Sequence, residues 1–513
     1  MRHLLERSGG FIPPLAALAL PVVSLPIASD SYILPRASLV IAAACLGAGV
    51  AFLIPGRPSL GSLRLPLIAA AAAALLAFAF SISWPLSLAG SYTRYESLPM
   101  RLAYLGLAAS TVWLLRTTRQ REMVGAGFVA GTTVVAFKAW LQWFQHAPFR
   151  PDGDLGNANL LAALIVMAIP IAIDRGVRSR RLTGAWAVAI VIMLAGLIVT
   201  TSRSGALGLV AGCAVWLTLS VPARARIPVG VVSGAGLVAA LSFVLLSPLR
   251  ALNDDPPELR FNLWQDALRL IAARPVTGWG EDATGLAFGH FLSRDYAGLV
   301  TFDRVHSGLL EITATQGVIG LAALGWAVFV VALAAWRGRA EPGVAGLAGA
   351  LTGYTVWVLF NFDWAPATGA FWLVAGTLWS AALPRLRGSP APPSPAATPP
   401  HRWGGVIAAG LVLAAVVFAV LPILADVWYV HGRSDLAVKA DPLQAQYHWA
   451  IGTVDELRRA AELGETEPGM YVQLGDLEAR SGDRNAARAA YRRALEIAPF
   501  YTPARQRLAA LGT

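Results

Sequence analysis

The sequence predicts an all-α, polytopic membrane helix bundle followed by a small C-terminal helical domain. Three observations support this fold class. Hydrophobic residues make up 56% of the chain and charged residues only 14%, whereas soluble domains carry about 25% charged residues. The mean hydropathy is +0.57. Apolar stretches of about 20 residues, each long enough to cross a bilayer as a helix, recur along the first four fifths of the chain.

Thirteen apolar segments are predicted to span the membrane: 11–29, 37–55, 65–83, 99–115, 123–145, 159–173, 183–200, 205–220, 228–247, 306–335, 343–360, 365–383 and 404–424. The segments 159–173 and 205–220 are short for a span of about 20 residues. The first segment follows Arg2 and Arg7 and resembles a signal peptide. Four prolines within it and the twelve spans behind it favour a retained anchor.

The arginines are concentrated in alternate loops between these spans. One set of loops, which starts with Arg2 and Arg7, holds most of them; the other set and its span edges hold Arg36, Arg94, Arg101, Arg150 and Arg203. Lys and Arg accumulate in cytoplasmic loops. We therefore expect a multi-pass protein of the bacterial cytoplasmic (inner) membrane, with a cytoplasmic N-terminus and a periplasmic C-terminal domain. This distribution also explains the net charge of +11 without nucleic acid as a partner.

The chain is expected to divide into a transmembrane domain at 1–383 with an exterior loop at about 248–305, a Pro-rich linker at 384–403, a final transmembrane helix at 404–424 and an exterior helical domain at 425–513. The last part shows the spacing of a tetratricopeptide repeat (TPR) through Tyr471, Leu474, Gly475, Ala487, Tyr491, Ala494 and Pro499. Glu478 stands where the repeat usually has an aromatic residue. Residues 441–463 are expected to form a degraded partner pair and 502–511 a capping helix.

This TPR-like domain is expected to act as a tethered module outside the membrane. Such helix pairs commonly present a binding surface, although a domain that only steadies the membrane part remains an alternative. Because the candidate phosphate ligands all precede it, removal of residues 430–513 is expected to leave donor binding intact and to weaken use of the acceptor.

The first candidate site is Thr200-Thr201-Ser202-Arg203-Ser204-Gly205, at the exterior start of a predicted span. Ser202 and Ser204 are expected to cap the following helix. Its N-terminal amides and dipole, beside Arg203, favour an anion such as phosphate. An ordinary interfacial loop with a snorkelling arginine is the alternative.

The second candidate site begins at Arg260 in the long exterior loop and continues to Thr277-Gly278-Trp279-Gly280. Arg260, Trp264, Leu268 and Ile271 keep helical spacing, which predicts an amphipathic helix against the membrane or the bundle. Arg260 at its start can contact a phosphate with two N–H groups. A plain interfacial helix with aromatic anchors explains the apolar face equally well.

The third candidate site runs from His306 to Glu311 and on to Gln316-Gly317-Val318-Ile319-Gly320. His306 opens a span at its exterior boundary and Glu311 lies about one and a half turns inside, so both are expected to face a water-filled cavity. A histidine there can accept a proton from a sugar hydroxyl or hydrogen-bond a phosphate. A helix-end histidine with satisfied hydrogen bonds is the alternative.

In this order and at about this spacing, the three runs resemble the O-antigen ligase and polymerase superfamily. Gly156-Asn157-Ala158-Asn159, and Gly90 with Arg94, are similar to its secondary motifs. The resemblance covers about residues 60–383. The chain departs from it at Gln316, where many relatives have an acid.

The resemblance implies an inverting, metal-independent glycosyltransferase with a GT-C-like helix bundle, no cofactor, and a glycan on undecaprenyl diphosphate as donor. Arg203 and Arg260 match the family's diphosphate-binding arginines, and His306 matches its essential histidine. The physical reading agrees, because two guanidiniums can stabilise a diphosphate leaving group while a histidine activates the acceptor hydroxyl. The remaining residues expected to bind substrate are Ser202, Ser204, Glu311, Asn157, Asn159 and Arg94.

The sequence leaves the acceptor open between lipid A-core, a growing polysaccharide and a protein. Membrane lipids are expected partners, and residues 425–513 offer a surface for a protein partner.

A transporter or flippase would need ionisable groups at mid-depth, where Lys138 is nearly all the chain offers. A scaffold that recruits partners through its tail would leave the arginine and histidine sites without a purpose. Asp152-Gly153-Asp154 is typical of a turn and is not expected to hold a metal.

The loop charges predict that Arg203, Arg260 and His306 all face the exterior. Single cysteines placed at these three positions are therefore expected to react with a membrane-impermeant maleimide added from the periplasmic side. If the Arg203 and His306 positions were labelled from opposite faces, they could not form one site.

Overall fold

The computed structural model describes residues 8–54, 58–179, 181–246, 257–296, 304–386 and 403–512. This part of the chain folds into helices joined by turns and loops, and it contains no strand. The predicted fold class, an all-α polytopic membrane bundle, is confirmed. Most of the predicted linker at 384–403, and parts of the predicted exterior loop at 248–305, lie outside the described residues.

The bundle and its loops contain helices α2 (Ile12–Val22), α3 (Ile33–Leu53), η1 (Gly61–Leu63), α4 (Arg64–Ala79), α5 (Trp84–Ala89), α6 (Leu98–Leu114), α7 (Thr118–Phe144), α8 (Ala158–Arg178), α9 (Thr183–Val199), α10 (Arg203–Ser220), α11 (Ala223–Leu246), α12 (Pro257–Ala273), α13 (Gly285–Phe288), η3 (Gly289–Phe291), α14 (Gly308–Arg337), α15 (Val344–Val358) and α16 (Ala365–Leu386). The C-terminal part contains α17 (Gly404–Ala415), η4 (Val416–Val420), α18 (Leu421–Val430), α19 (Ser434–Ala440), α20 (Ala445–Ile451), α21 (Val454–Leu463), α22 (Pro468–Arg480), α23 (Arg484–Ile497) and α24 (Thr502–Ala510).

Twelve of the thirteen predicted spans coincide with a helix or, for the last, with the continuous run α17–η4–α18. In the first, 11–29, the helix covers only Ile12–Val22, so residues 23–29 are not helical. Among the described residues, seven helices are long and apolar enough to cross a membrane: 33–53, 61–79, 118–144, 158–178, 203–220, 308–337 and 404–430. Three further apolar helices are shorter, namely α2, α9 and α15. The chain is thus polytopic, while the full count of thirteen crossings stays a prediction.

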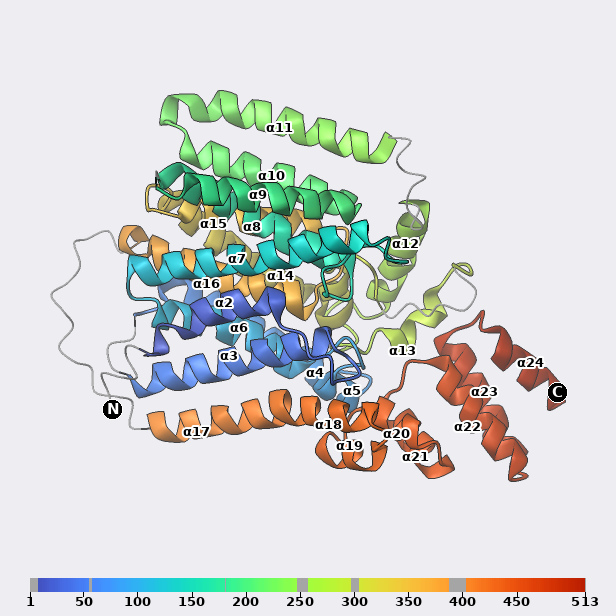
Figure 1. The fold of residues 1–513 in the computed structure, drawn as a ribbon. Coiled ribbons are helices and arrows are strands. Elements are labelled where there is room, and N and C mark those ends of the chain that lie inside the picture. Colours follow the sequence, from blue (N-terminus) through green and yellow to red (C-terminus); the bar gives the residue numbers. More distant parts are fainter. Residues whose placement is uncertain are drawn as a thin grey trace.

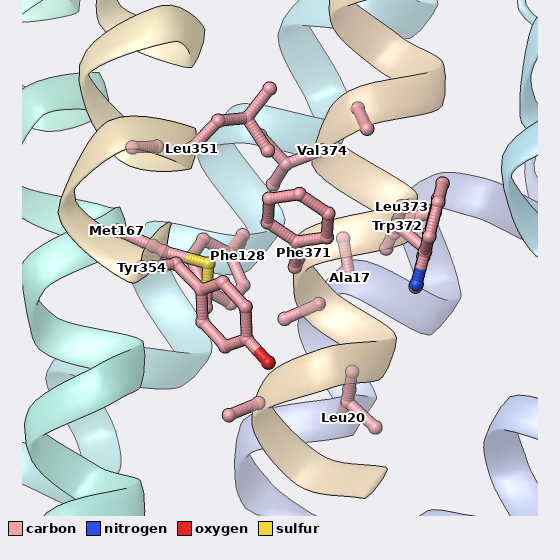
Figure 2. Packing of buried hydrophobic residues seen from close by; sticks show 14 of the residues in the cluster. Ala17, Leu20, Phe128, Met167, Leu351, Tyr354, Phe371, Trp372, Leu373 and Val374 are labelled. Carbon is pink, nitrogen blue, oxygen red and sulfur yellow. The ribbon is translucent and has the colours of Figure 1, made fainter. Parts of the chain in front are cut away.

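Helix α8 lies at the centre of the bundle. Every side chain from Leu161 to Ala168 is 0% exposed, because α7, α9, α10 and α15 pack around it. A helix that is apolar on all sides is expected to be buried in this way. Figure 2 shows Met167 of α8 beside Phe128, Tyr354 and Phe371 in this core. The predicted span 159–173 is therefore enclosed by other helices despite its short length.

Helices α10 and α15 approach each other closely through facing glycines. A Cβ on Gly208 would lie 2.6 Å from the carbonyl oxygen of Gly353, and one on Gly212 would lie 2.6 Å from that of Gly349. Small residues four apart allow helix backbones to meet in a membrane, where packing and not the hydrophobic effect drives association. The contact brings the first turn of α10 next to the end of α15.

Helix α14 is broken at Gly317, whose φ of 67° and ψ of −169° are not helical. The segment 275–280 fits into the break: the amides of Trp279 and Gly280 donate to the carbonyls of Ala314 and Thr315 at 2.9 and 3.0 Å. In return, the amide of Val318 donates to the carbonyl of Pro275 at 2.8 Å. The segment 275–280 thereby satisfies the backbone groups that the break releases.

The bundle helices run side by side, and the loops that carry the predicted motifs gather at one end of them (Figure 1). We call this the site end. It includes the loops 90–97, 145–157 and 359–364, the helices α12 and α13, and the C-terminal helices α19–α24, which we call the tail. Loops predicted to be cytoplasmic meet one another as well, since Arg178 pairs with Glu122 at 3.4 Å.

The tail consists of short helix pairs. In α22 and α23, Gly475 permits close contact, because a Cβ there would lie 2.4 Å from the Tyr491 ring. Helices α20, α21 and α24 occupy the segments expected for a degraded pair and a capping helix. Glu478, the departure from the repeat pattern, is 3% exposed and binds Arg458 of α21 at 2.7 Å. The helix pairs agree with the predicted pattern, while membership of the TPR family stays a prediction.

The tail is packed against the site end, whereas the sequence predicted only that it is tethered there; its division from the bundle as a separate domain stays a prediction. One hydrophobic core joins Leu86, Ala283 and Leu286 of the bundle loops to tail residues such as Leu457 and Ile497. The approach is close, since a Cβ on Gly289 would lie 2.3 Å from the carbonyl oxygen of Ile497. Burial of shared apolar surface makes docking favourable, so removal of residues 430–513 would expose part of the loop core.

Asp426 of α18 connects the tail to two bundle loops. Its carboxylate is 0% exposed. It accepts hydrogen bonds from the Asp30 amide at 2.8 Å, the Tyr92 hydroxyl at 2.7 Å and the Tyr447 hydroxyl at 3.2 Å. These three donors come from the α2–α3 loop, the α5–α6 loop and α20, so a single side chain holds three elements together.

Gly317→Ala is expected to destabilise the protein, because a Cβ there would lie 2.0 Å from the Val276 carbonyl oxygen at a φ that favours glycine. Backbone strain alone costs about 1–3 kcal/mol. Gly325→Ala, in the same helix with nothing within 4 Å of the new Cβ, is the matched control and is expected to be stabilising by about 0.5–1 kcal/mol. Thermal unfolding in detergent measures both; an unchanged Tm for Gly317→Ala would contradict the described break.

Asp426→Ala is expected to loosen the tail, since each buried donor left without an acceptor costs about 1–3 kcal/mol. Hydrogen exchange should rise in 90–95 and 445–451 in the reconstituted protein. Asp435→Ala, at a 57% exposed side chain of the same region, is the control and should leave both segments protected. Equal exchange in the two variants would show that Asp426 does not anchor the tail.

Candidate active site

The connection 359–364 between α15 and α16 is the point where the three candidate sites meet. The Asn361 side-chain amide donates to the Ser204 hydroxyl and to the Trp357 carbonyl, each at 2.9 Å. The Phe360 carbonyl accepts a hydrogen bond from the Arg260 guanidinium. The Phe362 ring lies edge-on to the His306 ring, with centroids 5.2 Å apart. Three successive residues thus contact all three motifs.

The first candidate site forms the N-terminus of α10. Ser202 is the N-cap, and its hydroxyl accepts from the Gly205 amide at 3.3 Å. The same hydroxyl donates to the side-chain oxygen of Asn159 at 2.9 Å, while Asn157 caps α8 through the Asn159 amide at 2.8 Å. Arg203 is the first residue of α10 and is partly buried. Asn157 and Asn159 therefore position the start of α10, where the backbone amides and the helix dipole favour an anion. Contact of these two asparagines with substrate stays a prediction.

Arg150 supports the same helix start. Its guanidinium donates to the Thr200 carbonyl at 2.6 Å and to Asn159 at 3.4 Å. Thr201 adopts a φ of 51°, which turns the chain from α9 into α10. Arg150, from the α7–α8 loop, thus holds this turn. The sequence analysis placed it among the predicted exterior arginines but not among the candidate site residues.

The second candidate site lies on α12, the amphipathic helix expected from the spacing. Its buried face is formed by Leu263, Ala267, Leu270 and Ile271. Leu268 was expected on the apolar face but is 55% exposed. The helix packs on α14 and η3 with the residues just named, which lie beside Leu268 on the helix surface. Arg260 near the start of α12 is partly buried and reaches the 359–364 connection.

The third candidate site is a turn that a buried ion pair holds. His306 has a φ of 53° and is partly exposed. Immediately before it, Arg304 is 1% exposed and binds Glu311 at 3.0 Å, and the Val305 amide donates to the other Glu311 oxygen at 3.0 Å. Glu311 is 0% exposed. It does not face a water-filled cavity as expected, because a buried carboxylate needs donors, and here it clamps the chain that presents His306.

Arg94 joins this arrangement from the α5–α6 loop. Its guanidinium lies 5.0 Å from the Phe362 ring centroid and 4.6 Å from that of Trp364, a distance at which cation–π attraction operates. The Trp364 indole N–H donates to the Thr93 carbonyl at 3.2 Å. Phe362 therefore separates two predicted site residues, Arg94 and His306, and touches both.

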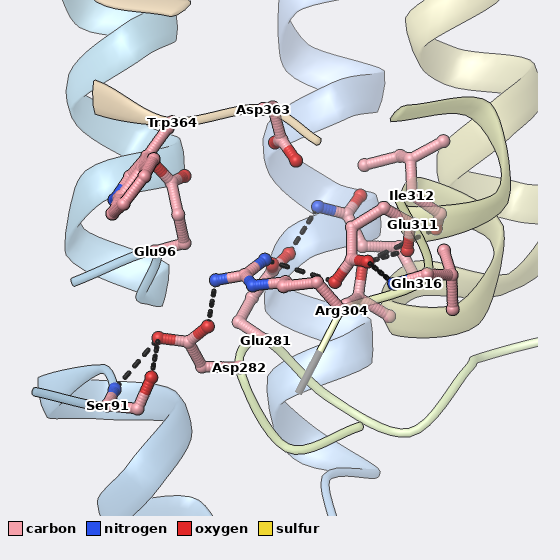
Figure 3. A network of polar contacts seen from close by, with 12 residues as sticks. Ser91, Glu96, Glu281, Asp282, Arg304, Glu311, Ile312, Gln316, Asp363 and Trp364 are labelled. Carbon is pink, nitrogen blue, oxygen red and sulfur yellow. Dashed lines mark hydrogen bonds and ion pairs between the residues drawn. The ribbon is translucent and has the colours of Figure 1, made fainter. Parts of the chain in front are cut away.

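A buried charge network lies behind these residues (Figure 3). Asp282 accepts from the Ser91 amide at 2.8 Å and pairs with Arg304, which in turn pairs with Glu311. In a second branch, Glu281 accepts from Arg101 at 2.9 Å and from the Gln316 side chain. The Gln316 side chain thus donates a hydrogen bond to Glu281. An acid from another segment therefore lies close to the point on α14 where many members of the resembled superfamily have an acid.

Carboxylates outnumber cations in this network. Arg101 also pairs with Asp363, and Glu96 lies 3.6 Å away and accepts from Tyr104 at 2.6 Å. Burial raises the pKa of Glu96 to about 8, although Arg101 opposes the change. Burial would also raise the pKa of Asp363, but Arg101 and Arg304 hold it below its ordinary value. Burial also raises the pKa of Glu281, so proton uptake by these two carboxyls, Glu96 and Glu281, would reduce the surplus negative charge.

Sequence reasoning did not assign Arg101, Glu281, Asp282, Arg304 or Asp363 to the site. A signal was present for some of them: Glu281 and Asp282 directly follow the Gly278-Trp279-Gly280 run, and Arg101 is one of the exterior-side arginines. For the 359–364 connection, the only signal in the sequence was its position between two predicted spans. The Asp152-Gly153-Asp154 segment forms a turn whose amides at 152 and 153 donate to Gln142 at 3.0 and 2.9 Å.

Two adjoining cavities lie within the bundle, and the smaller one reaches the network. The first, of about 220 Å³, has Arg101, Gln316 and Asp363 at one end and apolar side chains along the rest. The second, of about 580 Å³, is lined almost wholly by apolar residues of α10, α11, α14, α15 and α16. Both share Val328, Thr355, Phe371 and Trp372, so they adjoin one another.

Comparison with known proteins adds a family to this geometry. Residues 188–325 match the family model described as O-antigen ligase. The matched segment contains Arg203, Arg260 and His306, whereas Arg94, Arg101 and the 359–364 connection lie outside it. No curated protein matches the chain. This match, within a polytopic helix bundle, confirms the predicted resemblance to the O-antigen ligase/polymerase superfamily at residues 188–325.

Proposed function

We propose that the chain transfers a glycan from an undecaprenyl-diphosphate donor to an acceptor hydroxyl at the site end, with inversion and without a metal. The O-antigen ligase domain supports glycan transfer in polysaccharide or glycoconjugate assembly. The finer proposal rests on one observation, that the connection 359–364 contacts all three candidate sites. It binds Ser204, the neighbour of Arg203, and it also contacts Arg260 and His306.

Arg203 and Arg260 are assigned to the donor diphosphate. Arg203 begins α10, where the helix N-terminus adds amides and a favourable dipole for an anion. Arg260 approaches the same connection from α12. Charge builds up on the diphosphate as the glycosidic bond breaks, and fixed guanidiniums stabilise that charge most strongly where water is excluded.

The apolar cavities suit the polyprenyl chain of the donor. Their walls come from helices that lie within the membrane bundle. The smaller cavity is also lined by Leu359 and Asp363 of the 359–364 connection, so a lipid tail placed in it would lie next to the connection that Arg260 contacts. The chain is already surrounded by hydrocarbon in the bilayer, so an apolar cavity can accept it without a desolvation cost.

His306 is assigned to the acceptor. In a single displacement, the acceptor oxygen attacks the anomeric carbon and forms the new glycosidic bond. The bond from that carbon to the diphosphate oxygen breaks, and the diphosphate leaves with the electron pair. The acceptor proton passes to His306 as general base. The Arg304–Glu311 pair and the Phe362 ring fix the turn and the ring orientation that this transfer requires.

The orientation in the membrane follows from the loop charges. We assign the site end to the periplasmic face of the bacterial inner membrane, with the N-terminus in the cytoplasm. The loops 90–97, 145–157 and 359–364 then face the same compartment as the tail. The lipid-linked donor would be used there after it has crossed the membrane.

The transfer is tested with the purified full chain in lipid nanodiscs, a defined undecaprenyl-diphosphate glycan and three acceptors: lipid A-core, a polysaccharide repeat and a protein. We expect transfer to one of them with an inverted anomeric configuration by NMR. Arg260→Lys is expected to lower kcat/KM about 10²-fold, because a point-like ammonium cannot reproduce a two-pronged diphosphate contact.

Arg269→Lys is the matched control. It lies on the same helix with a 58% exposed side chain paired to the buried Asp266 at 2.9 Å, and Asp266 keeps hydrogen bonds from Ser293 and Tyr296 in the variant. It should therefore keep near wild-type turnover. Equal turnover in the two variants would make Arg260 an interfacial anchor, and absence of both transfer and donor cleavage with every acceptor would refute the proposed function.

A further inference from the structure

A polar pocket of about 260 Å³ lies between the bundle and the tail. Its bundle wall is formed by Leu86 and Gly90–Arg94, and its tail wall by Leu443–Gln446 and Leu463–Glu467. Neither part of the chain encloses the pocket alone. The pocket therefore exists only because the tail docks onto the site end.

Direct contacts fix both walls. The Gln444 side-chain amide donates to the Gly90 carbonyl at 3.2 Å across the junction. On the bundle side, Asp282 accepts from the Ser91 amide and hydroxyl at 2.8 and 3.2 Å. On the tail side, a Cβ on Gly464 would lie 2.6 Å from the Ser83 hydroxyl. The pocket is thus a preformed feature, as ligand sites usually are.

The pocket is connected to the candidate active site through Arg94. This residue lines the pocket, and its guanidinium lies over the rings of Phe362 and Trp364. Phe362 in turn contacts His306. Arg94 and the Phe362 ring therefore lie between a molecule in the pocket and the residue assigned to the acceptor hydroxyl.

The lining contains both hydrogen-bond donors and acceptors. Glu465 and Glu467 offer carboxylates, Gln446 an amide and Thr466 a hydroxyl. Burial raises the pKa of Glu465 to about 7, while the amides of 467 and 466 oppose the change, so near neutral pH this carboxyl can both donate and accept. Hydroxyl groups of a sugar need such mixed partners, whereas the apolar cavities in the bundle suit a lipid chain.

We propose that this pocket binds a sugar unit of a saccharide acceptor next to the unit that carries the reacting hydroxyl, which makes the TPR-like tail part of the acceptor site. The proposal rests on the proposed glycan transfer. The volume is near the low end of ligand pockets, which measure about 300–1,000 Å³, and this suits a sugar unit. A polypeptide acceptor would need a groove several residues long.

Binding is tested first without the donor, by cysteine protection in the full chain. Cys45 and Cys213 are replaced by Ala, and Thr466→Cys places a thiol in the pocket. Delipidated core oligosaccharide or a polysaccharide repeat unit is expected to slow maleimide labelling at least about fivefold at saturation, because a bound sugar excludes the reagent. Thr502→Cys, at an exposed position outside the pocket, is the matched control and should label at the same rate with or without saccharide.

Turnover provides the second measurement. Thr466→Trp fills the pocket and is expected to raise the acceptor KM about tenfold, equivalent to about 1.4 kcal/mol, with little change in kcat or donor binding. Thr502→Trp should leave all three unchanged. If Thr466→Trp does not fold, the protection measurement still decides.

Three outcomes would overturn the pocket assignment: an unchanged acceptor KM in folded Thr466→Trp, no protection of the cysteine by either saccharide, or protection only by a Ser/Thr-rich peptide. Failure of the proposed function looks different. In that case no acceptor is glycosylated, while protection by saccharide is still observed and the pocket remains a sugar site.

Discussion

The close approach of α10 and α15 is the contact on which the candidate site depends. Glycines at 208 and 212 face glycines at 353 and 349, and an added Cβ would lie 2.6 Å from a backbone oxygen of the other helix at 208, 212 and 349. Within a bilayer such packing replaces the hydrophobic effect as the source of helix association. It brings the capped start of α10 beside the end of α15, where Asn361 binds Ser204.

From that point the 359–364 connection gathers residues that are distant in the chain. Arg260, His306 and Arg94 reach its consecutive residues through a carbonyl and an aromatic ring. Behind them, buried ion pairs between Arg304 and Glu311 and between Arg101 and Glu281 hold the loops that present these residues. Buried charges are costly unless they are paired. We interpret this network as the rigid support of a site whose front surface is cationic.

The docked tail changes how the chain is divided into domains. A linker and a final span suggested an independent appendage, yet the tail shares a hydrophobic core with the loop that carries Glu281 and Asp282. It also forms one wall of the polar pocket next to Arg94. Loss of the tail would therefore disturb the loop core as well as the pocket.

The sequence by itself determined the fold class and the positions of the helices, because each spanning helix satisfies its own backbone hydrogen bonds and its apolar length can be read locally. It also predicted Arg203, Arg260 and His306 as candidate site residues from local runs at the ends of apolar segments. It could not show that Glu311 is buried beneath His306, or that Arg101 pairs with Glu281 and Asp363. These partners lie 180 and 262 residues from Arg101 in the chain, and no local pattern encodes such a pairing. Only the tertiary structure decided those contacts and the docking of the tail, because both depend on which buried surfaces and charges fit together in space.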